Sequence, residues 1–159
     1  MKLSNGETMT GYSRPSRWGS DAVRLFVSLF LCVLGLAYAS LLAQIGLDTE
    51  MRVPLIADAY RGFGPGEFVA HALQYLSWFI VAFGASLGAL LATSYSEKIK
   101  IFAVIWTPAW IVLDVGGVWL IRYHDAFARL LFVSGLVLAL TFLVFFCLVQ
   151  YDIWLKKGH

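Results

Sequence analysis

The sequence predicts an all-α integral membrane protein, a four-helix transmembrane bundle with a short interfacial helix in its first outer loop. The first observation is composition: 60% of the 159 residues are hydrophobic and only 14% are charged, against roughly 45–50% and about 25% in soluble domains. The second is that four apolar runs are long enough to cross a bilayer, which takes about 20 helical residues. The third is that proline, glycine and charged residues gather between these runs and end them.

The chain divides into an N-terminal tail (1–20), a transmembrane domain (21–154) and a C-terminal tail (155–159). The four expected spans are 22–47, 68–93, 101–121 and 127–151. The outer loop between the first two is expected at 48–66. A cleavable signal peptide is an alternative for the first run, because Ala37-Tyr38-Ala39 imitates a cleavage site. The run continues well past that point, which favours a span.

The loop at 48–66 contains the predicted interfacial helix. Pro54 suits the first turn of a helix, and the apolar and charged residues that follow it can separate onto two faces. Such a segment is typical of a helix that lies in the membrane surface. The second span then opens after Gly64-Pro65-Gly66, with Glu67 in the first turn, where the helix dipole favours an acid.

The basic residues predict an orientation. Four spans place both termini on one side, and eight of the twelve Lys and Arg residues fall on that side. Basic residues near short loops favour the cytoplasm, so both tails are expected to be cytoplasmic in a bacterial inner (plasma) membrane. The loop at 48–66 and the turn at 122–125 are then outside. The inner side is basic and shows no evident site.

Small residues four apart predict where helices pack, because helices in lipid associate through close contact. The second span has a GxxxG pattern extended by one turn, and the first span has a similar stripe. The two stripes are expected to lie against each other or against another subunit. The residues are Gly35, Ala39, Ala43, Gly84, Gly88 and Ala92.

Asp114 is the strongest candidate for a functional residue. It lies near the middle of the third span, where a carboxylate is costly and usually faces protein or a water-filled cavity. Trp110, one turn away, could donate its indole N–H to it, and Pro108 removes a backbone hydrogen bond nearby. Asp114 could serve a proton, ion or substrate site, or it could fix helix packing as a buried acid.

A polar cluster is expected at the outer interface, where the second span begins and the third ends. Imidazole and carboxylate groups suit zinc, copper or iron, so four of these residues (His71, His124, Glu67 and Asp125) are weak metal candidates. One His per helix is no recognised ligand motif, and ordinary interfacial hydrogen bonding is the favoured interpretation. The cluster comprises Glu67, His71, Gln74, Arg122, His124 and Asp125.

Other site classes have no support in the sequence. The net charge of +2 gives no basis for nucleic-acid binding, and the two cysteines form no CxxC or Cys/His spacing. No histidine lies deep enough in a span for a bis-His haem. No cofactor is expected, although contact with lipid or a quinone fits the outer cluster. The partners expected are membrane lipids and other membrane protein subunits.

Three functions follow as hypotheses. The leading one is a non-catalytic accessory or structural subunit of a larger membrane complex, including the energy-transducing kind, because few polar groups are buried and small-residue stripes are present. The second is a small membrane redox enzyme or helper that acts on a quinone or lipid at the outer interface. The third is a small transporter that uses Asp114. The balance leans away from an enzyme.

Overall fold

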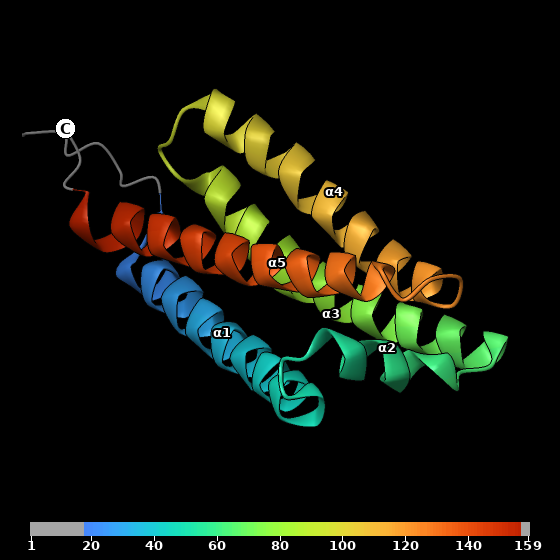
Figure 1. Cartoon of the computed structure of the whole chain (residues 1–159). Helices are drawn as coiled ribbons and strands as arrows, with labels where there is room; N and C mark the ends of the chain where they lie inside the picture. Colours follow the sequence, from blue (N-terminus) through green and yellow to red (C-terminus); the bar gives the residue numbers. More distant parts are fainter. Residues whose placement is uncertain (1–17, 157–159) are drawn as a thin grey trace, which may run out of the picture.

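A computed structural model describes residues 18–156 of the chain, and within them the structure is entirely helical (Figure 1). Its elements are α1 (Asp21–Thr49), α2 (Val53–Arg61), α3 (Pro65–Ala92), α4 (Glu97–Ile121), α5 (Phe127–Gln150) and a π-helical turn, η1 (Tyr151–Leu155), that extends α5. The expected all-α fold, with four long apolar helices and a short helix in the first loop, is confirmed. Most of the expected N-terminal tail, and residues 157–159, lie outside the described residues.

Local chemistry sets several helix ends. Pro65 opens α3, and the carboxylate of Glu67 accepts a hydrogen bond from the Gly64 N–H at 2.7 Å, which satisfies a donor that the helix itself leaves free. Pro108 lies inside α4, yet α4 runs without a break. The connection from α1 to α2 turns sharply, because Glu50 and Met51 both adopt the left-handed conformation, with φ of 48° and 54°.

The helices do not pack equally closely. α4 and α5 form the most extensive pair, α3 packs on both, and α1 makes fewer contacts with the rest. α4 and α5 approach each other closely at Gly117, where a Cβ would make van der Waals contact with the Leu131 backbone nitrogen at 3.7 Å. α2 contacts α1, α4 and α5. It lies at one end of the bundle, opposite the α3–α4 connection and η1 (Figure 1). We call these two ends the α2 end and the η1 end.

The lateral surface of the bundle is apolar. Large side chains point outward from each long helix; Leu36 on α1, Ile105 on α4 and Leu140 on α5 are 70%, 66% and 62% exposed. Such continuous apolar exposure on four helices of 24 to 29 residues suits lipid rather than water. The protein is an integral membrane protein.

The expected contact between the two small-residue stripes within the chain is wrong. Gly84, Gly88 and Ala92 are exposed, and no described atom beyond the helix's own neighbouring backbone comes within 4 Å of a Cβ built on either glycine. Ala39 and Ala43 are exposed as well, while Gly35 faces the ring of Phe142 on α5. The α3 stripe instead borders a shallow groove against aromatic residues of α1. The alternative, contact with another subunit, stays a prediction.

Candidate functional site

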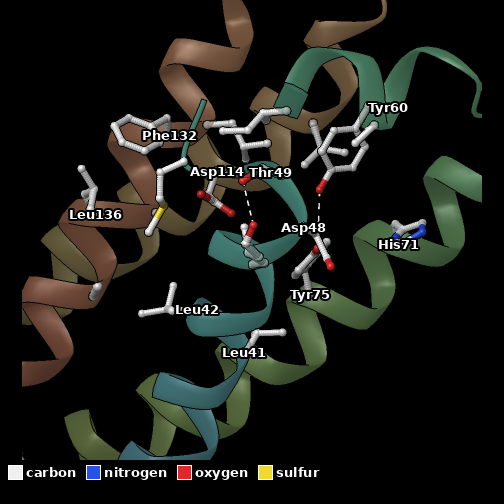
Figure 2. A pocket seen from close by; sticks show the side chains of 18 of the residues that line it. Leu41, Leu42, Asp48, Thr49, Tyr60, His71, Tyr75, Asp114, Phe132 and Leu136 are labelled. Atoms are coloured by element: carbon white, nitrogen blue, oxygen red, sulfur yellow. Dashed lines mark hydrogen bonds between the residues drawn. The ribbon is translucent and has the colours of Figure 1, made fainter. Parts of the chain in front are cut away.

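A pocket of about 300 Å³ lies at the α2 end of the bundle, and all five α-helices contribute to its wall (Figure 2). It fills the space that α1 leaves beside α3 and α5, with α2 across its end. Leu41 and Leu42 of α1 and Leu136 of α5 supply apolar surface. Leu136 and Asp48 are themselves exposed, which places the rim of the pocket at the surface of the bundle.

Asp114 forms part of the pocket wall and is 7% exposed. Its Oδ1 accepts a hydrogen bond of 2.6 Å from the Ser134 hydroxyl on α5. Within residues 18–156 no second hydrogen-bond donor and no basic side chain pairs with this carboxylate. Ser134, rather than the expected Trp110, is the donor, because Ser134 on the closely packed α5 faces Asp114.

A group of aromatic side chains lies on the α3 and α2 side of the pocket (Figure 2). The His71 ring stacks on Phe63, with centroids 4.7 Å apart, and lies 6.1 Å from the Tyr75 ring. The hydroxyls of Tyr60 and Tyr75 are 3.5 Å apart. Burial raises the pKa of Tyr60 well above its usual value, so its hydroxyl stays protonated and donates to the Tyr75 hydroxyl.

The expected outer cluster does not form one site. Of its six members only His71 lines the pocket. Glu67 is engaged by Gly64, His124 accepts a hydrogen bond from the Ala126 N–H, and Asp125 pairs with Arg61 of α2. Gln74 and Arg122 are exposed. Glu67 and His124 therefore bind neighbouring backbone groups and Asp125 binds α2, so these side chains do not converge on a common site.

The weak metal candidates fare likewise. Across residues 18–156 no three His, Cys, Asp or Glu side chains come close enough together to hold a metal ion. His71 faces aromatic rings, and His124 belongs to the turn before α5. The described residues therefore do not assemble a metal centre from His71, His124, Glu67 and Asp125.

Sequence reasoning missed most of the pocket. Tyr38, Tyr60, Ser134 and Gly135 belong to the pocket or touch Asp114, and none of them was a candidate. One signal was available: His71, Tyr75 and Phe79 are spaced by four and therefore share a face of α3. That face turns out to line the pocket.

The η1 end holds a second buried acid, which was not among the expected site residues. Asp152 is 7% exposed and accepts hydrogen bonds from the Trp18 indole at 2.9 Å and from the Ser94 N–H and hydroxyl. Lys156 donates to the Ser94 hydroxyl and lies over the Tyr95 ring. This network joins the segment before α1, the α3–α4 connection and η1. Asp152 is not among the residues that line the pocket at the α2 end or the groove beside the α3 stripe.

Comparison with known proteins identifies a family. Residues 68–159 match the model of the family Aq_1264_TM, which is described as a transmembrane helical domain. The match takes in α3, α4 and α5, with His71, Asp114 and Ser134, whereas α1 and α2 precede it. No curated protein and no solved structure gives a significant match.

Proposed function

This chain belongs to the Aq_1264_TM family of transmembrane helical domains, and we propose that it binds a small amphiphilic molecule, drawn from the membrane, in the pocket beside Asp114. The pocket itself carries the proposal. Ligand sites are typically concave, of about 300–1,000 Å³, and mostly apolar with a few convergent polar groups. The pocket at the α2 end has this volume and combines leucine and aromatic walls with Asp114, Tyr60, Tyr75 and His71.

The position of the polar groups supports a ligand with an apolar body and a polar head. Tyr60, Tyr75 and His71 gather toward α2, whereas Leu42 and Leu136 line the wall on the side of α1 and α5. A quinone or a lipid head group entering from one leaflet would find hydrogen-bond partners at one end and apolar surface along its length. We propose that the α2 end faces outward, as the basic residues of the two tails and the α3–α4 turn favour.

Filling the pocket tests this function. Gly135 lines the pocket, and a Cβ added there would meet open space, so Gly135→Leu should occupy the ligand's volume without disturbing the helix contacts. Gly116→Leu is the matched control, because Gly116 also has open space and is not part of the pocket wall. The protein is purified from native membranes, and the small molecules enriched with it are identified by mass spectrometry.

We expect a compound that is enriched with the wild type and with Gly116→Leu but lost with Gly135→Leu. The same set of enriched compounds with all three proteins would contradict the proposal.

A second candidate function is that of an accessory subunit, and the uncovered α3 stripe favours it. Gly84, Gly88 and Ala92 leave α3 without bulky side chains on an exposed face, which allows a helix of another chain to approach closely. Under this proposal Gly88→Leu removes co-purifying membrane proteins in mild detergent, whereas Ala109→Leu, an exposed small residue on α4, does not. Equal co-purification with both variants would argue against the subunit role.

A further inference from the structure

We infer that the ligand of this pocket is an organic cation, an apolar amine or quaternary ammonium compound whose charged centre lies beside Asp114. The inference rests on the proposed ligand-binding function and names the class of ligand. Three properties of the pocket point to it: the signs of the charges in its wall, the unfinished hydrogen bonding of Asp114 and the aromatic character of the walls.

The charged groups of the wall are acidic. Asp114 and Asp48 both line the pocket, and the described lining residues include no Lys or Arg. Arg61, the basic residue of α2, is exposed and pairs with Asp58 and Asp125. A ligand with a carboxylate or phosphate group would therefore meet two acids, with His71, stacked on Phe63, as the one basic side chain of the described wall, whereas a cation would meet favourable charge at the rim and in the interior.

Asp114 lacks a counter-charge. The carboxylate is more than nine-tenths buried, and one neutral hydroxyl is its only hydrogen-bond partner in residues 18–156. An ionised carboxylate in a membrane span is costly without a partner charge. A cation in the pocket would supply the missing positive charge directly beside the carboxylate, because Asp114 itself forms part of the pocket wall.

The walls can stabilise an ammonium group as well. Six of the lining side chains are Phe or Tyr: Tyr38, Tyr60, Phe63, Tyr75, Phe79 and Phe132. Aromatic faces attract a cation within about 6 Å of the ring centroid, more strongly where water is excluded. An acid enclosed by aromatic rings therefore favours a cation with apolar substituents over a small hydrated metal ion, which requires several oxygen ligands.

Three probes of similar shape but different charge test the inference. Benzyltrimethylammonium is a cation, neopentylbenzene is its neutral isostere and benzylsulfonate is an anion. Binding of each to the full chain in the nonionic detergent dodecyl maltoside is measured by ligand-observed NMR, with empty micelles as the blank. The proteins compared are wild type, Asp114→Asn, the acid control Asp58→Asn and the pocket-filling Gly135→Leu.

We expect the wild type to bind the cation at least tenfold more tightly than the neutral probe and to show no binding of the anion. Asp114→Asn should weaken binding of the cation at least tenfold and leave the neutral probe unchanged. Asp58→Asn should match the wild type, since Asp58 is exposed on α2 and outside the pocket wall. Gly135→Leu should abolish binding of both probes.

Equal binding of the cation and the neutral probe by the wild type would overturn the inference. This comparison uses the wild type alone, so it does not depend on whether a variant folds. If Gly135→Leu still abolished that binding, the ligand-binding function would stand without the charge preference. If Gly135→Leu changed nothing, both proposals would fail. Competition by lysophosphatidylethanolamine would identify a lipid amine as the source of the cation, and lack of competition a water-soluble amine; both agree with the inferred charge.

Discussion

The two buried carboxylates of this bundle have equal exposure, 7% each, and opposite surroundings. Asp152 accepts hydrogen bonds from Trp18 and from two groups of Ser94, in a network that joins three separate segments. Asp114 accepts one bond from Ser134 and forms part of a pocket wall. The several hydrogen bonds that Asp152 accepts from the chain account for it as a structural residue. The single hydrogen bond of Asp114, beside a pocket, suggests that a bound ligand supplies a further partner.

The largest effect is expected at Asp152. Asp152→Ala leaves the Trp18 indole and the Ser94 N–H without their acceptor, and buried donors that lose their partner are costly. The free energy of unfolding should fall by about 2–4 kcal/mol, measured by denaturant titration in detergent. Asp21→Ala, at an exposed acid that pairs with Arg24, should change it little. Equal effects of the two variants would break the comparison.

Asp114→Asn should give the opposite pattern. The amide oxygen can still accept the Ser134 hydrogen bond, and the substitution removes a buried charge at nearly constant volume. The free energy of unfolding should therefore change by less than about 1 kcal/mol, while binding of the cationic probe falls at least tenfold. A loss of stability as large as that of Asp152→Ala would make Asp114 a structural residue instead.

The last pair of variants compares the loss of a single hydrogen bond with the loss of one among several. Ser134→Ala removes the hydrogen bond found for Asp114, whereas Trp18→Phe removes one of several at Asp152 and keeps the ring in its cluster. We expect losses of about 1–2 kcal/mol and about 0.5–1 kcal/mol respectively, compared as thermal midpoints in the same detergent. The reverse order would show that Trp18, rather than the Ser94 groups, holds the Asp152 network together.

Much of the fold could be predicted, because membrane spans are encoded by length and hydrophobicity alone. The break at 62–66 and Pro54 also located α2 and the start of α3, since proline and glycine restrict the local backbone directly. The candidate site could be predicted only in part. Asp114 stood out by its place in an apolar run, and His71 by its residue type, but their neighbours did not.

The neighbours were hidden because each spanning helix is apolar on all sides, so the pattern that reveals the buried face of a soluble helix is missing. Lipid and protein interior are both apolar, and the sequence does not distinguish a glycine facing one from a glycine facing the other. Gly84 and Gly88 illustrate this: their spacing predicted a contact, and both are exposed among residues 18–156.

The sequence by itself thus determined that the protein is an integral membrane protein with four spans and a short surface helix, because those features depend on local composition and on punctuating residues. Only the tertiary structure decided that α1 packs less extensively on the bundle than α3 and α5 do, that α2 lies across the opening and that Ser134 meets Asp114. Those features depend on how helices from distant parts of the chain rotate and pack, for example where α4 meets the α5 backbone at Gly117, and no local signal encodes them.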